Sequence, residues 1–86
     1  MNDVAKEVRA PFDITDAIVA YRDSGEDDEP DPITIPAGRR LWAQVKNQQV
    51  RRLRGRLVPV VRFTMGIDPT WYWVPREVFD RVARPV

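Results

Sequence analysis

Apolar residues recur along this chain with two different spacings. Between Asp13 and Ser24 they follow the helical pattern i, i+3, i+4, i+7, at Ile14, Ala17, Ile18 and Tyr21. Asp13 is a suitable N-cap, Asp16 adds negative charge to the first turn, and Gly25 follows the last turn. The spacing therefore predicts a helix over residues 13–24.

From Ile33 onward the pattern becomes that of β-strands. Apolar and polar residues alternate over residues 40–46, and a run rich in β-branched residues covers residues 56–65. A turn and a short aromatic strand at residues 71–74 follow. Pro75 then suits the first position of a helical turn. The apolar side chains of this turn are expected to point inward: Val78, Phe79 and Val82.

Residues 39–54 fit two patterns. As a helix, they would place Trp42 and Leu53 on one face, and Gly55 would cap the C-terminal end. As two strands, they would turn at Asn47-Gln48. The clean alternation of the flanking segments favours the hairpin, and the choice decides where the neighbouring arginines point.

An acidic segment at residues 25–32 separates the two parts of the chain. It contains five acidic residues, two prolines and no apolar residue, a composition that predicts a flexible loop. We therefore expect a helical extension with this loop over residues 1–32, followed by a small β-barrel domain over residues 33–86. The expected fold class is mainly β (α+β), and a chain of 86 residues has room for one small core.

Charge divides the chain at the same place. Residues 1–32 carry ten acidic and three basic residues, whereas residues 33–86 carry three acidic and eleven basic residues, so net charges of −7 and +8 combine to +1. Twelve of the fourteen basic residues are arginines, whose planar side chains bind phosphate through paired hydrogen bonds. The basic stretch predicts a surface for a polyanion. Two alternatives are a solvated face without a ligand and a face covered by the acidic segment.

The composition removes many kinds of chemistry. The chain has no Cys and no His, which excludes a thiol nucleophile, a disulfide, a Cys/His zinc site and an imidazole base. Paired carboxylates occur only in the acidic segment. We expect no catalysis, no cofactor and no metal, except for a composite site shared between subunits. The longest uncharged apolar run, Leu57–Val61, is too short to span a bilayer, and the N-terminal stretch does not resemble a secretory signal, so a cytoplasmic protein with no membrane partner is expected.

Several segments resemble SH3-like small barrels of the Tudor and PWWP kind. Residues 38–45, Gly-Arg-Arg-Leu-Trp-Ala-Gln-Val, look like the first core strand of these barrels, and residues 55–58 resemble the second. Residues 72–75 and 77–82 resemble the closing strand, a single helical turn and a final short strand. The resemblance covers about residues 33–86, and the proline-tryptophan signature of PWWP domains is absent. It implies a module that binds nucleic acid, peptides or other proteins.

The candidate binding residues combine the arginines with aromatic side chains. They are Arg39, Arg40, Trp42, Arg51, Arg52, Arg54, Arg56, Trp71 and Tyr72. Trp42 is expected to be exposed and Trp73 to be buried, while Arg52, Arg54 and Arg56 would line one face of a strand. The first hypothesis is a nucleic-acid-binding module in which arginines contact phosphate and a Trp stacks on a base.

The alternative is a protein-interaction module, such as an adaptor, an inhibitor or a mobile-element accessory protein. Its Trp, Tyr and Arg side chains are the residue types that dominate interface hot spots. An acidic protein surface would then be the partner. The opposite charges of the two parts of the chain also allow head-to-tail association into a homo-oligomer.

Overall fold

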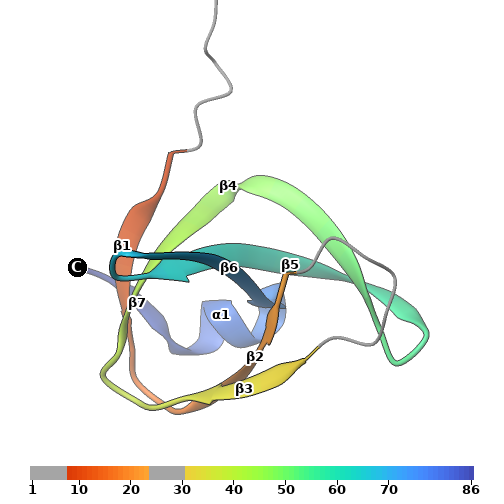
Figure 1. The fold of residues 1–86 in the computed structure, drawn as a ribbon, viewed down its shortest axis with the longest axis horizontal. Helices are drawn as coiled ribbons and strands as arrows, with labels where there is room; N and C mark the ends of the chain where they lie inside the picture. Colours follow the sequence, from red (N-terminus) through yellow and green to blue (C-terminus); the bar gives the residue numbers. More distant parts are fainter. Residues whose placement is uncertain (1–7, 24–30) are drawn as a thin grey trace, which may run out of the picture.

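The computed structural model describes residues 8–23 and 31–86, and its strands form one antiparallel sheet (Figure 1). The elements in chain order are β1 (Ala10–Ile14), β2 (Ile18–Arg22), β3 (Pro32–Ile35), β4 (Arg40–Leu53), β5 (Arg56–Met65), β6 (Asp68–Pro75), α1 (Arg76–Val82) and β7 (Ala83–Pro85). The strand order across the sheet is β3-β2-β6-β5-β4-β1-β7. The expected mainly-β character is confirmed.

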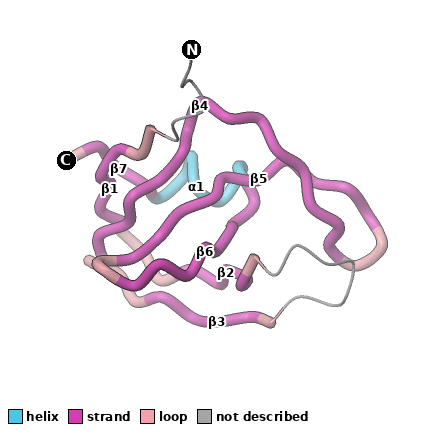
Figure 2. Tube along the Cα trace, turned by 45° about the horizontal axis from the view of Figure 1, so that its top comes forward, coloured by secondary structure: helices cyan, strands magenta, loops and turns pink. Residues whose placement is uncertain are grey.

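The sheet curls into a half-barrel, and α1 lies within the curl (Figures 1 and 2). The segment between β3 and β4 returns to the end of β1, where the Gly38 amide donates to the Ile14 carbonyl at 2.8 Å. The Ile14 amide in turn donates to the Arg39 carbonyl at 3.2 Å. These bonds draw the β3 side of the sheet toward β1, so the architecture is compatible with a small barrel.

The predicted helix over residues 13–24 is wrong. Residues 10–14 and 18–22 are strands instead: β1 pairs with β4 and β7, and β2 pairs with β3 and β6. Ile14 and Ile18 are both buried, but Ala17, which a helix would also bury, is exposed. The helical spacing arises because Ile14 ends one strand and Ile18 begins the next, and both side chains enter the same core. Long-range pairing therefore overrides the local pattern.

The remaining N-terminal expectations fall largely outside the described residues. The expected loop at residues 25–32 is described only at its end, where Pro32 already pairs with Tyr21 as part of β3. Gly25, the expected helix cap, is outside this range.

Strand alternation builds the main core on the concave face of the sheet. Phe63 is fully buried at its centre, and the Tyr72 ring stacks on it with 5.8 Å between ring centroids. The expected helical turn is confirmed as α1, which follows Pro75 and packs against β5 and β6. Phe79 and Val82 of α1 are buried, and Val78 packs against the core, as expected. No helix in the described part of the chain is long and apolar enough to cross a membrane.

Residues 40–53 form one long strand, so both the helix and the turn at Asn47-Gln48 are wrong. The pairing with β5 passes from Gln44 opposite Arg62 to Gln49 opposite Val60, so β4 carries extra residues in a bulge. Arg76 Nη2 donates to the carbonyl oxygens of Val45 and Asn47 in this bulge, both at 3.3 Å. The expected strand over residues 56–65 is confirmed as β5.

The turn between β4 and β5 is instead at Arg54-Gly55. Both residues have positive φ, 51° and 80°, which is the pattern of a two-residue type I′ hairpin. Gly55 adopts this conformation without steric cost, and the twist of a type I′ turn matches that of the flanking strands. The tight turn fixes the pairing register of the hairpin.

Replacing Phe63 tests the packing of the core. Because its side chain is fully buried, we expect Phe63→Ala to lower the free energy of unfolding by about 3–5 kcal/mol. The control is Ile67→Ala, at a fully exposed position, where we expect a change within about 0.5 kcal/mol. Urea unfolding followed by circular dichroism measures both, and equal effects would contradict this description of the core.

Candidate functional site

The outer part of the β4–β5 hairpin extends beyond the rest of the sheet. We call residues 50–59 the hairpin arm, because β1 pairs with β4 only at residues 40–43 and β6 pairs with β5 only from Val60 onward. Figures 1 and 2 show the arm at the right of the molecule. Its exposed basic residues are Arg52, Arg54 and Arg56.

These three arginines point in different directions, so the expectation that they line one face of a strand is wrong. Arg52 is opposite Leu57, and Leu53 is opposite Arg56, in the antiparallel register. Opposed residues of a pair share a face and successive residues alternate, so Arg52 and Arg56 lie on opposite faces of the arm. Arg54 occupies the turn between them. The positive charge therefore surrounds the tip of the arm.

The charges at the tip have no acidic neighbour in the part of the chain that the structure describes. The ion pairs of residues 8–23 and 31–86 involve Arg40, Arg51 and Arg62, and none involves the three arginines of the tip. The Arg52 guanidinium only donates a long hydrogen bond, at 3.5 Å, to the Gly55 carbonyl. Among the described residues, therefore, no acidic side chain forms an ion pair with these three arginines.

Arg51, at the base of the arm, is neutralised by Asp23. Arg51 Nε and Nη2 donate to the two Asp23 carboxylate oxygens at 2.9 and 3.0 Å, and Arg62 Nε donates to Oδ2 at 2.8 Å. The Asp23 side chain is only 7% exposed, and its backbone amide donates to the Trp71 carbonyl at 2.9 Å. This two-arginine ion pair, which we call the Asp23 bridge, joins the end of β2 to β4 and β5.

The surroundings of Asp23 favour its charged form. Burial raises the pKa of this carboxyl, but the hydrogen bonds and positive charges of Arg51 and Arg62 outweigh burial, so the pKa is lowered from 3.8. The Asp23 bridge is therefore intact at neutral pH. Its stabilising effect is present above about pH 4 and is lost as the pH falls through the lowered pKa.

The aromatic candidates are mostly covered. The Arg62 guanidinium lies over the Trp71 ring at 4.2 Å from the centroid, and the Arg9 guanidinium lies 5.6 Å from the same ring. Trp73 is buried as expected, next to Tyr21 with 4.6 Å between ring centroids. Tyr72 faces the core. Trp73 is therefore not available to stack on a base, and the Tyr72 ring already stacks on Phe63.

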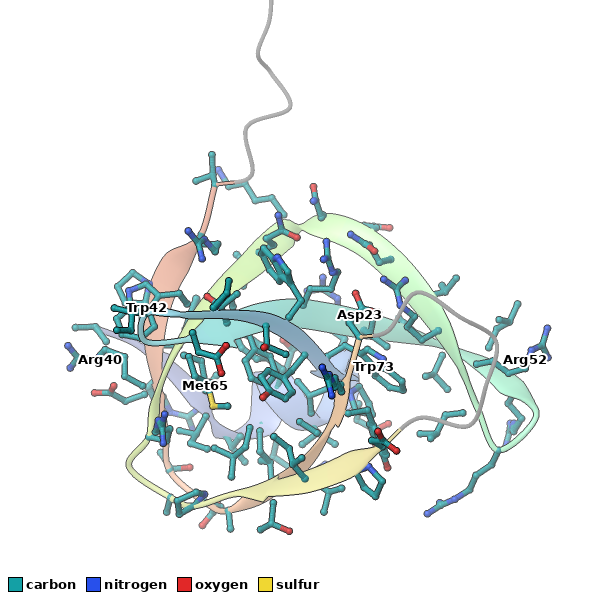
Figure 3. All side chains as sticks on the ribbon, viewed as in Figure 1. Asp23, Arg40, Trp42, Arg52, Met65 and Trp73 are labelled. Carbon is teal, nitrogen blue, oxygen red and sulfur yellow. The ribbon has the colours of Figure 1, made fainter. Side chains whose placement is uncertain are left out.

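The remaining candidates lie at the other end of the molecule. Trp42 and Arg40 lie at the left in Figure 3, whereas Arg52 lies at the far right along the longest axis. Trp42 is half-buried, Arg39 is exposed in the segment before β4, and Arg40 Nε donates to Asp13 Oδ1 at 2.8 Å. The nine candidates therefore do not form one surface: the arginines of the tip gather at one end of the molecule, and Arg40 and Trp42 lie at the other.

Of the three residues in the Asp23 bridge, the sequence pattern singles out Arg51 but neither Asp23 nor Arg62. Asp23 and Arg62 are 39 positions apart, and no local pattern couples them. The pattern also does not predict the exposed apolar side of the arm, where Val50 and Leu57 are 53% and 62% exposed. A depression of about 260 Å³ adjoins this side, lined by Gln48, Gln49, Val50, Pro59 and Arg76. The cross-strand register is needed to see that Val50 and Leu57 share a face with Arg52.

Within residues 8–23 and 31–86, no group of acidic side chains could hold a metal ion. No family model, no curated protein and no solved structure matches this chain in sequence or fold. The hairpin arm and the Asp23 bridge are therefore the features of this protein that bear on its function.

Substitution of Asp23 tests whether the bridge stabilises the fold. At pH 7 we expect Asp23→Asn to lower the free energy of unfolding by about 1–3 kcal/mol, because the partly buried Arg51 and Arg62 lose their charged acceptor. The difference between wild type and variant should shrink below pH 4, where the wild-type carboxyl also becomes neutral.

The measurement is urea unfolding at pH 7 and at pH 3. Asp13→Asn is the matched control, because Asp13 pairs with Arg40 at the exposed surface, where ion pairs contribute little. A difference for Asp23→Asn that is unchanged at pH 3 would show that the carboxylate charge is not what stabilises the bridge.

Proposed function

We propose that this protein is a non-catalytic nucleic-acid-binding module that contacts phosphate groups through the hairpin arm. The observation that carries the proposal is the group of three exposed arginines at the tip, which have no ion-pair partner among residues 8–23 and 31–86. Arg51 and Arg62 instead share the single carboxylate of Asp23 as their ion-pair partner. Several exposed positive charges gathered at a projecting tip suit a phosphate-binding element.

The proposal includes the finer resemblance to SH3-like barrels of the Tudor and PWWP kind. The curled antiparallel sheet and the short helix after β6 support it. Modules of that class act by binding, and the hairpin arm then supplies the particular ligand contact in this chain. Because the aromatic side chains lie away from the tip, the proposed contact depends on arginines and not on a stacked Trp.

Salt dependence tests this proposal. With a labelled pool of mixed DNA and RNA oligonucleotides, three neutralised phosphates predict a slope between about −2.1 for single strands and about −2.7 for duplex DNA in log affinity against log salt. A fourfold increase in salt should then weaken binding about 20-fold to 40-fold. In Arg52→Gln/Arg56→Gln two of these contacts are lost, and the same increase should weaken binding only about threefold to fourfold.

The control variant removes the same charge elsewhere. Arg81→Gln/Arg84→Gln changes two exposed arginines near β7, on the opposite side of the molecule from the tip (Figure 1). It should retain the wild-type slope. Equal weakening by the two double variants would assign binding to net charge alone, and an affinity that is independent of salt would exclude phosphate recognition.

The exposed apolar side of the arm supports a second candidate function, a protein-interaction module. Val50 and Leu57 share a face with Arg52, and aliphatic and arginine side chains together suit a protein interface. A protein partner bound there should be lost with Leu57→Ser, which leaves the charge of the tip unchanged. Fluorescence anisotropy of the labelled protein, measured once with the protein partner and once with the oligonucleotide pool, separates this outcome from nucleic-acid binding.

A further inference from the structure

We propose that the ligand is duplex DNA and that the tip of the hairpin arm enters its major groove. This inference rests on the proposed function and specifies its ligand. Three features of the described residues support it: the covered aromatic rings, the placement of arginines on both faces of the arm, and the dimensions of the arm.

The first feature, the covered aromatic rings, argues against a single-stranded ligand. Proteins that bind single-stranded nucleic acid stack successive bases on aromatic side chains along a basic groove. Here Trp73 is buried, the partly buried Tyr72 packs against the core, and Arg62 lies over Trp71 at 4.2 Å. The half-buried Trp42 lies at the opposite end of the longest axis from Arg52 (Figure 3). No stacking ring is therefore placed beside the tip.

The second feature fits a ligand with two backbones. Arg52 and Arg56 extend from opposite faces of the arm, and Arg54 lies at the turn. A single strand that passes one face could neutralise only one of the two outer arginines. A groove has a phosphate backbone on each side, so an arm inside it can place Arg52 and Arg56 against different strands. Arg54 then reaches toward the base edges, where guanine offers two acceptors to an arginine.

The third feature is size. The arm has four residue pairs between Val60 and the turn, so it projects about 13 Å at about 3.3 Å for each residue. The major groove of B-form DNA is about 12 Å wide and about 8.5 Å deep and admits a two-stranded β-ribbon. The arm is thus long enough to bring Arg54 to the floor. The corresponding groove of duplex RNA is too narrow for side chains to read, which favours DNA.

The arm is also held in place before it meets a ligand. Arg51 ties its base to Asp23 through two hydrogen bonds of 2.9 and 3.0 Å, and the type I′ turn fixes its end. A pre-ordered element loses less conformational entropy on binding than a flexible loop does. This rigidity suits insertion into a groove of defined shape.

Direct comparison of four probes tests the inference: a 20-base-pair DNA duplex, each of its two single strands, and an RNA duplex of the same sequence. Labelled probes at one fixed salt concentration give the dissociation constants. We expect the DNA duplex to bind at least tenfold more tightly than either single strand or the RNA duplex. Because Trp42 lies at the opposite end of the longest axis from Arg52 and Arg62 lies over Trp71, Trp fluorescence should stay unchanged at saturation.

Arg54→Gln should weaken binding of the DNA duplex at least fivefold, since it removes the contact at the floor of the groove. Arg84→Gln, an exposed arginine distant from the tip, is the matched control and should bind as the wild type does. Circular dichroism confirms that both variants are folded.

The possible failures can be distinguished. Single strands that bind as tightly as the duplex, with quenching of Trp fluorescence, would overturn the duplex inference and leave the proposed function standing. An RNA duplex that binds as tightly as DNA would overturn the assignment to the major groove. Absence of binding to all four probes would overturn both the inference and the proposed function.

Discussion

A single carboxylate, that of Asp23, joins the end of β2 to both strands of the β4–β5 hairpin. It accepts hydrogen bonds from Arg51 in β4 and Arg62 in β5, and it lies at the end of β2. Arg62 in turn covers the ring of Trp71. Removing charged side chains from water is costly unless each finds a partner, and here one acidic group serves two bases. The same contacts hold the base of the hairpin arm against the sheet.

The sequence allowed prediction of the elements whose pattern is local. The strand at residues 56–65 and the helix after Pro75 are confirmed because β-branched residues and a proline at a helix start act within their own segments. The helix expected at residues 13–24 failed for the opposite reason. Its apparent periodicity joined Ile14 and Ile18 across a turn, and only the distant strands that pair with β1 and β2 reveal their true conformation.

The candidate site was predictable in composition but not in geometry. The density of arginine in residues 51–56 pointed to the tip of the hairpin, yet the turn expected at Asn47-Gln48 placed those residues on one strand. The type I′ turn at Arg54-Gly55 requires a positive φ at Arg54, and the sequence pattern does not predict such a conformation at an arginine. Moving the turn by seven positions changed the arrangement from one charged face to a charged tip. The Asp23 bridge required contacts between residues 28 and 39 positions apart.

The hairpin arm has a further consequence for how copies of this protein behave toward one another. Along residues 50–53 and 56–59 the two strands of the arm pair with each other, and no other strand of residues 8–23 and 31–86 covers their outer edges. Exposed edges of this kind recruit strands from other molecules and promote aggregation, and the exposed Val50 and Leu57 add to that tendency. Charged side chains along an edge oppose such pairing through mutual repulsion. The arginines at the tip therefore also oppose edge-to-edge pairing between copies of this protein.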